Sequence, residues 1–90
     1  MKKESRTHIV ARYYPDGRIE EHDERLTLKE MQEAVGGYIL LVSCAIPGRS
    51  LIVNEDGNQL SLALNPTASR LVSEGVLIGS GLRGVVLLVA

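Results

Sequence analysis

The stretch VGGYILLV, Val35–Val42, joins two different hydrophobic patterns. Before it, apolar residues recur at helical spacing, whereas residues 38–42 are all apolar. Gly36 can end the helix, because glycine adopts the left-handed conformation without a side-chain clash. Gly37 allows close approach of neighbouring backbone. We therefore predict that residues 38–42 form a strand buried on both faces, in the middle of a sheet.

The first part of the chain predicts a β-hairpin. Residues 8–14 alternate as in a strand, which places Ile9 and Ala11 on the same face. The sequence YPDG at 14–17 is typical of a tight turn, with proline presetting one corner and glycine accepting a positive φ. Residues 18–22 then return as a polar strand, and we expect it at a sheet edge, where charges discourage unwanted pairing.

A capping box marks the start of the helix that precedes the two glycines. The Thr27 hydroxyl can accept the amide of Glu30, while the Glu30 carboxylate can accept the amide of Thr27. The helix then runs to about Val35. Its spacing predicts that Leu28, Met31 and Val35 are buried.

Turns and apolar runs divide the rest of the chain. The predicted elements are a strand at 38–44, a turn at 46–49, a strand at 51–53, a hairpin turn at 54–57, a strand at 60–64, a helix from Asn65-Pro66 to about Gly75, and a last strand within 84–90. The last strand is also apolar on both faces, so we place it beside residues 38–42. The result is a single α+β domain over 1–90, with residues 1–6 as a frayed arm. Its order is β-β-α-β-β-β-α-β, with five or six strands in a mixed or antiparallel sheet.

Composition excludes several functional classes. The formal net charge is −1, which argues against binding nucleic acid through a basic face. Three tyrosines and no Phe or Trp leave little for base stacking. We expect a cytoplasmic protein, because the single Cys44 fits a reducing compartment and no segment reads as a signal peptide or membrane span.

Three motifs suggest chemistry that their context does not support. Residues 79–84 match the dinucleotide-binding pattern, but a strand follows where a helix is needed, so we interpret them as a glycine loop. His8 and His22 could face each other across the hairpin, near Glu21 and Asp23, yet no further metal ligand converges on them. Cys44 lacks a partner base and reads as a buried apolar residue. We predict no enzyme activity, no metal and no cofactor.

Five residues form a hypothetical ligand site: Tyr38, Asn54, Glu55, Asn65 and Arg70. Amide, carboxylate and guanidinium groups near a helix start could bind an anion. The alternative is that Asn54 and Glu55 belong to an ordinary turn and Asn65 to an ordinary helix cap, and it explains the residue types equally well.

Three motifs, VGGYI at 35–39, VNEDG at 53–57 and LNP at 64–66, resemble a small family of unknown function found in bacteriophage, plasmid and bacterial genomes. The resemblance covers about residues 26–90. It implies a compact α+β domain and a phage or mobile-element origin, and no activity. The chain departs from the family pattern at Leu40, where relatives carry an acidic residue, and in its longer loop at 79–84.

The function expected from these observations is that of a non-catalytic accessory protein, encoded by a phage or mobile element, which binds a host or phage protein. The alternative is a small-molecule module that sequesters an anionic metabolite or nucleotide signal. Two short helices suffice to cover only one face of a sheet. We therefore also predict a homodimer or higher oligomer, formed through the uncovered face or through the C-terminal strand.

Overall fold

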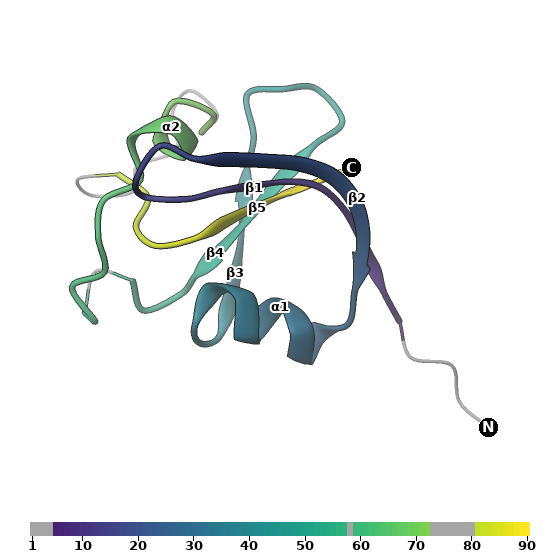
Figure 1. The fold of residues 1–90 in the computed structure, drawn as a ribbon, viewed down its shortest axis with the longest axis horizontal. Helices are drawn as coiled ribbons and strands as arrows, with labels where there is room; N and C mark the ends of the chain where they lie inside the picture. The colour runs from purple at the N-terminus through teal and green to yellow at the C-terminus, as the bar shows by residue number, and fades with distance from the viewer. Residues whose placement is uncertain (1–4, 58, 73–80) are drawn as a thin grey trace.

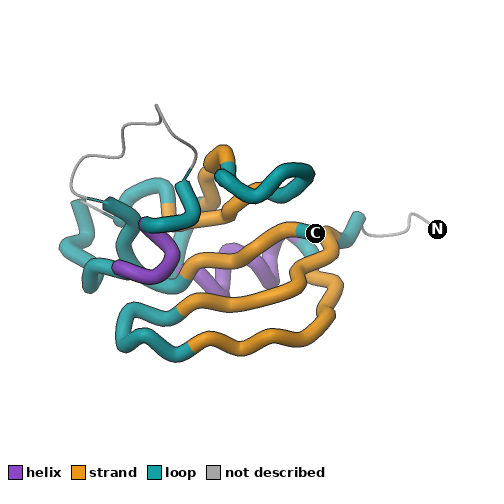
Figure 2. Tube along the Cα trace, turned by 90° about the horizontal axis from the view of Figure 1, so that it is seen from above, coloured by secondary structure: helices purple, strands orange, loops and turns teal. Residues whose placement is uncertain are grey.

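The computed structural model describes residues 5–57, 59–72 and 81–90 as an α+β domain with one five-stranded antiparallel sheet (Figures 1 and 2). The elements are β1 (Thr7–Tyr13), β2 (Ile19–Leu26), α1 (Leu28–Val35), β3 (Ile39–Ser43), β4 (Ser50–Asn54), α2 (Pro66–Ser69) and β5 (Val86–Val89). The α+β class is confirmed, with the order β-β-α-β-β-α-β.

The strand order in the sheet is β2-β1-β5-β4-β3. The C-terminal strand β5 therefore lies in the centre, and β3 lies at an edge, so the predicted central position of residues 38–42 is wrong. Leu40 and Leu41 are 44% and 65% exposed. The two apolar strands are not adjacent either, because β4 separates them. An apolar run does not determine where a strand lies in the sheet, because that position depends on pairing with strands distant in the sequence.

The strand predicted at 60–64 is absent. The turn after β4 continues instead, since the amide of Leu60 donates to the carbonyl of Asp56 (2.9 Å) and that of Leu62 to Gly57 (3.1 Å). Among the described residues, the one β-bridge of this segment joins Leu64 to Arg83. Leucine alternation alone cannot form a strand when the backbone groups already bond locally.

Each face of the sheet carries its own core, and the helices lie on opposite faces. α1 covers a cluster of Ile9, Leu26, Met31, Val35, Ile52 and Leu87. α2 and the segment before β5 cover a second cluster of Ala11, Val42, Leu51, Val53, Ala68, Leu82, Val86 and Leu88. The prediction that one sheet face lies uncovered is therefore wrong.

A β-bulge in β1 changes which residues share a face. The pairing of β1 with both neighbours shifts register between Ile9 and Ala11. Ile9 consequently packs in the α1 cluster and Ala11 in the α2 cluster, so their predicted common face is wrong. The charged return strand does lie at the sheet edge, as predicted, and extends to Leu26.

The predicted features of α1 are confirmed at both ends. Thr27 and Glu30 form both bonds of the capping box, at 3.2 and 2.8 Å, and Gly36 adopts the left-handed conformation with φ 85°. Met31 and Val35 are buried, but Leu28 is 55% exposed, so its predicted burial is wrong. Leu28 is the first residue of α1, and its exposure shows that the sheet does not cover this position.

Two predicted details fall partly outside the described residues. α2 begins at Pro66 with Asn65 as its cap, as predicted, and is four residues long. Its predicted end at Gly75 lies outside the described residues, as do the first two residues of the glycine loop at 79–84 and most of the N-terminal arm.

Candidate functional site

Asn54, one of the hypothetical ligand residues, clamps α1 to the sheet. Its side chain is 5% exposed, its Nδ2 donates to the carbonyl of Val35 (3.0 Å), and its Oδ1 accepts the amide of Asp56 (2.8 Å). The first bond satisfies a carbonyl in the last turn of α1, which has no partner within the helix. The amide of Asn54 is thus used within the protein.

The second glycine of the VGGYI motif fits against this clamp. A Cβ atom at Gly37 would lie 3.0 Å from Asn54 Nδ2. The prediction of a close approach at Gly37 is thus right, but the neighbour is a side-chain amide rather than another backbone. The glycine pair and Asn54 therefore form one structural unit, in which Gly36 ends the helix and Gly37 leaves room for the clamp.

Asn65 holds three parts of the fold together. It is fully buried, and its Nδ2 donates to the carbonyls of Tyr13 (3.0 Å) and Gly84 (2.8 Å) while its Oδ1 accepts the amide of Ala68 (3.1 Å). These bonds tie the end of β1 and the segment before β5 to the start of α2. The sequence predicted the cap but gave no sign of the two long-range bonds.

The other three hypothetical ligand residues lie on the surface. Tyr38 is 69% exposed, and its carbonyl accepts the amide of Glu55 (2.8 Å), which brings the start of β3 next to the 54–57 turn. Arg70 is exposed at the end of α2. The structure thus groups Tyr38, Asn54 and Glu55, while the hydrogen bonds of Asn65 lead elsewhere.

The two histidines do not face each other, so the arrangement that the hairpin spacing allowed does not occur. His8 pairs with Arg25 in the hairpin register, because the return strand is longer than expected and bulged. His8 Nε2 lies 3.2 Å from Asp23, and His22 Nε2 lies 3.8 Å from Glu24. Among the described residues, no group of three His, Cys, Asp or Glu side chains is arranged to hold a metal ion.

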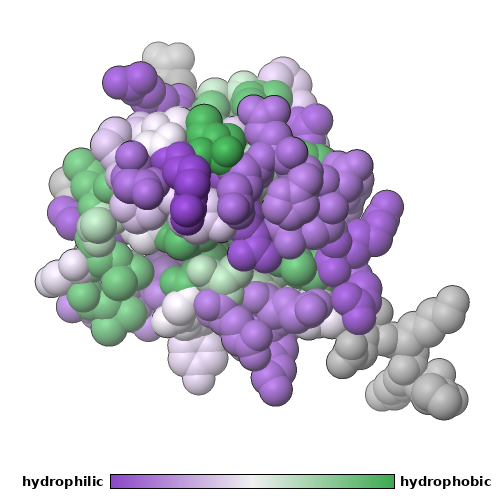
Figure 3. All heavy atoms as spheres, in the orientation of Figure 1, coloured by the Kyte–Doolittle hydropathy of each residue, from purple (hydrophilic) through white to green (hydrophobic). Residues whose placement is uncertain are grey.

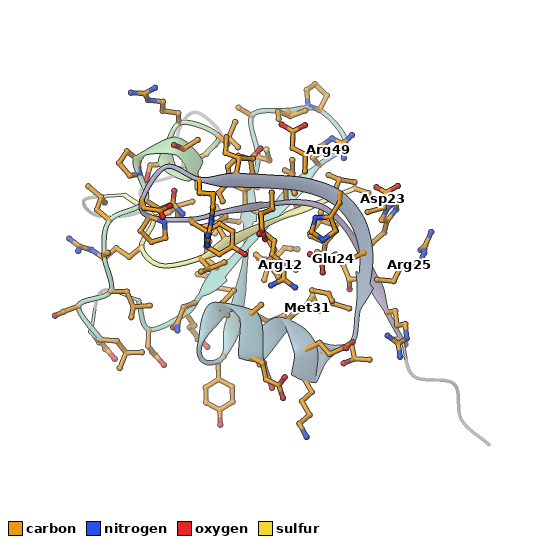
Figure 4. All side chains as sticks on the ribbon, viewed as in Figure 1. Arg12, Asp23, Glu24, Arg25, Met31 and Arg49 are labelled. Atoms are coloured by element: carbon orange, nitrogen blue, oxygen red, sulfur yellow. The ribbon has the colours of Figure 1, made fainter. Side chains whose placement is uncertain are left out.

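A half-buried ion pair occupies the hairpin on the side that carries α1 (Figure 4). Arg12 donates to both carboxylate oxygens of Glu24, at 2.6 and 2.9 Å. These bonds lower the pKa of Glu24 and raise that of Arg12. Nearby, Tyr14 donates to Glu20 (2.6 Å) and its ring lies 4.1 Å beneath the Arg18 guanidinium, so the polar groups of the hairpin largely pair with one another.

The two edges of the sheet differ in chemistry. β2 has five charged residues among eight (Glu20, Glu21, Asp23, Glu24 and Arg25), whereas β3, ILLVS, has none. Natural edge strands usually avoid such uncharged, apolar sequences, because their unpaired backbone groups invite another strand. The sequence shows the lack of charge over 38–44, but this pattern does not distinguish an edge strand from a central one.

Two further surface features lie away from β3. Apolar atoms gather over the turn segment between β4 and α2, where Leu60 and Leu64 are 55% and 41% exposed (Figure 3). An open depression of about 360 Å³ lies beside the start of α1, lined by Ser5, Thr27, Leu28, Lys29 and Gln32. It includes none of the five hypothetical ligand residues.

The fold is thus a small sheet with a helix on each face, two buried asparagine clamps and one uncharged edge. The chain belongs to the family described as a domain of unknown function, DUF3846, whose model matches residues 9–90. This agrees with the resemblance to an uncharacterised domain family. No curated protein and no solved structure gave a significant match. In the described part of the chain, every helix is too short or too polar to cross a membrane.

Proposed function

We propose that this protein is a non-catalytic binding module that recognises a protein partner by strand addition to the outer edge of β3, which pairs with no other strand among the described residues. The observation that carries the proposal is the uncharged sequence of this edge, which contrasts with the heavily charged opposite edge formed by β2. In strand addition, backbone hydrogen bonds supply affinity and the flanking side chains supply selectivity.

The backbone of β3 is suited to accept a strand. In an antiparallel pair, hydrogen-bonded and non-hydrogen-bonded residue pairs alternate. The Tyr38 carbonyl accepts the Glu55 amide, and the same register pairs Leu40 with Val53 and Val42 with Leu51. The even-numbered residues therefore bond to β4. Ile39, Leu41 and Ser43 direct their N–H and C=O groups toward the outer edge of the sheet, away from β4.

The exposed leucines favour strand addition over packing against a sheet face. Leu40 lies on the face that carries α2, because it pairs with the core residue Val53, and Leu41 lies on the face that carries α1, because it pairs with Ile52. A partner packed on one face would cover only one of them. A strand placed alongside β3 sets side chains next to both.

The biological setting belongs to the proposal too. The family resemblance supports a phage or mobile-element origin, and we propose that the protein acts as an accessory protein in the bacterial cytoplasm, on a host or phage protein. The small-molecule alternative has less support, since the amides of Asn54 and Asn65 already bond to the protein itself.

Site-specific photo-crosslinking in cells tests the proposal. A photoreactive phenylalanine analogue replaces Leu41, and a matched control replaces Leu28, which is 55% exposed on α1. We expect a discrete protein adduct from position 41 and none from position 28, with the adduct identified by mass spectrometry. The absence of an adduct at position 41, or the same adducts at both positions, would overturn strand addition at β3.

A further inference from the structure

We propose that the strand added to β3 is β3 of a second copy of this chain, which joins two sheets into one continuous ten-stranded sheet. This inference rests on the proposed strand addition at β3 and names a second copy, in place of a host or phage protein, as the partner at that edge. The sequence predicted an oligomer formed through an uncovered sheet face or through the C-terminal strand, and pairing at β3 replaces both of these contacts. β5 is paired on both sides and both sheet faces carry a core, so neither contact can form.

The chemistry of the edge strands favours self-pairing at β3 and opposes it at β2. A twofold antiparallel pair of β2 strands centred on His22 would set Glu20 opposite Glu24 and Glu21 opposite Asp23, and like charges directly opposite are destabilising. The sequence ILLVS of β3 contains no charge, so it meets its own copy without repulsion. Closed twofold dimers are the commonest assembly of identical chains.

One end of the β3 edge is already occupied, and this limits the register. The amide of Ala45, an outward-facing position by the same alternation, donates to the carbonyl of Leu71 (2.7 Å), and Cys44 makes an antiparallel bridge to Val72. A second strand can therefore pair only with the part of the edge that begins at Ile39 and ends before Cys44.

The register centred on Leu40 fits this open edge. It pairs Ile39 with Leu41 of the second copy, and the outward N–H and C=O groups of both residues meet in hydrogen-bonded pairs. Leu40 then faces its own copy in a non-hydrogen-bonded pair on the α2 side. On the α1 side, Leu41 packs beside Ile39 of the second copy. A register centred on Leu41 also lies within residues 39–43, but it pairs Ser43 with Ile39 of the second copy, directly beside the end held by Leu71 and Val72.

The first test is the mass of the full chain by light scattering over a wide range of protein concentration. We expect a mass of twice 9.8 kDa. Leu41→Pro should give a folded monomer, because proline removes an N–H group that does not bond to β4. If that variant does not fold, Leu41→Lys serves the same purpose, because it places a charge beside Ile39 of the second copy and sets the two lysines diagonally across the pair. Ile19→Lys, an exposed residue on the β2 edge, is the matched control and should remain a dimer.

The second test reads the register directly. Leu40→Cys, made together with Cys44→Ala, should form an intermolecular disulfide on oxidation, since non-hydrogen-bonded pairs bring Cα atoms to about 4.5 Å, within disulfide range. Leu28→Cys in the same background is the control and should not.

A wild-type mass of 9.8 kDa, or a Leu41→Lys variant that is still dimeric, would overturn self-pairing. If the wild type is monomeric and crosslinking at position 41 captures a different protein, self-pairing fails while strand addition stands. If crosslinking captures nothing, the proposed function itself fails.

Discussion

Replacing Asn65 with alanine should destabilise the fold far more than the loss of a helix cap. The side chain is fully buried and makes three hydrogen bonds, two as donor to Tyr13 and Gly84 and one as acceptor from Ala68. Alanine removes all three and leaves a buried amide and two carbonyls with one partner fewer. These groups come from three separate segments, so the loss affects more than α2.

The magnitude follows from adding two effects. Loss of an N-cap costs about 1 kcal/mol. A buried polar group left without its partner costs about 1–3 kcal/mol, and each of the two carbonyls falls at the lower end because it can accept weaker contacts. The sum is about 3 kcal/mol, out of a total stability of roughly 5–15 kcal/mol. For a domain of this size, that corresponds to a decrease in Tm of at least about 12 °C.

Urea unfolding followed by far-UV circular dichroism measures the effect, and Asn65→Asp separates the two contributions. Aspartate keeps the oxygen that caps α2, but it offers no N–H to the carbonyls of Tyr13 and Gly84 and adds a buried charge. We therefore expect Asn65→Asp to be at least as destabilising as Asn65→Ala. If Asn65→Asp matches the wild type and Asn65→Ala costs only about 1 kcal/mol, Asn65 is merely a cap and the reasoning is refuted.

Three further predictions concern stability. Gly36→Ala should cost about 1–2 kcal/mol in urea unfolding, purely from its positive φ of 85°, since the added Cβ has 3.9 Å of space; an unchanged midpoint would contradict this. The hydrogen bonds from Arg12 lower the pKa of Glu24 below its ordinary value of 4.5. The ion pair therefore stabilises the fold at pH values above 4.5, and this stabilisation is lost as the pH falls through the lower pKa of the folded state. Glu24→Gln should therefore flatten the fall in stability below about pH 4.5, and an identical pH profile would argue against it. Leu87→Ala should cost about 3 kcal/mol from a fully buried site, whereas Leu41→Ala should change monomer stability by under about 0.5 kcal/mol; equal effects would contradict the assigned edge.

Local structure was predictable from the sequence where a few neighbouring residues determine it. The capping box at Thr27, the left-handed Gly36 and the cap at Asn65 each depend on backbone groups within three or four residues. The turn at 14–17 is another case, with the Gly17 amide bonded to the Tyr14 carbonyl at 3.0 Å. Such interactions are specified by residue type and spacing alone.

The sequence was misleading where distant segments compete for the same place. β3 and β5 carry similar apolar runs, and only the pairing of β5 with β1 and β4 decides which of them is central. The bulge between Ile9 and Ala11 likewise has no sequence signature here, although it reverses the faces of β1. Because the exposed leucines are visible only once β3 is known to be an edge, the candidate binding surface could not be predicted.

The structural roles of Asn54 and Asn65 were not predictable for a related reason. Asn54 and Asn65 were candidates because polar residues in short motifs often bind ligands, with turn and cap roles as the alternative. The structure gives both of them buried hydrogen bonds to carbonyls far away in the chain, at Val35 for one and at Gly84 for the other. The motifs around them therefore hold helix ends to the sheet, and they explain the fold of this chain rather than an activity.

An apolar strand at a sheet edge and an apolar strand at the centre can carry the same sequence pattern, because in both the apolar side chains need cover from water on both faces. At the centre, neighbouring strands and helices of the same chain supply the cover, as they do for Leu87. At the β3 edge, the chain leaves Leu40 and Leu41 exposed while it places five charges on the opposite edge. If the dimer forms as proposed, the sequence pattern that indicated burial in β3 was informative, and the burial takes place between two molecules rather than within one.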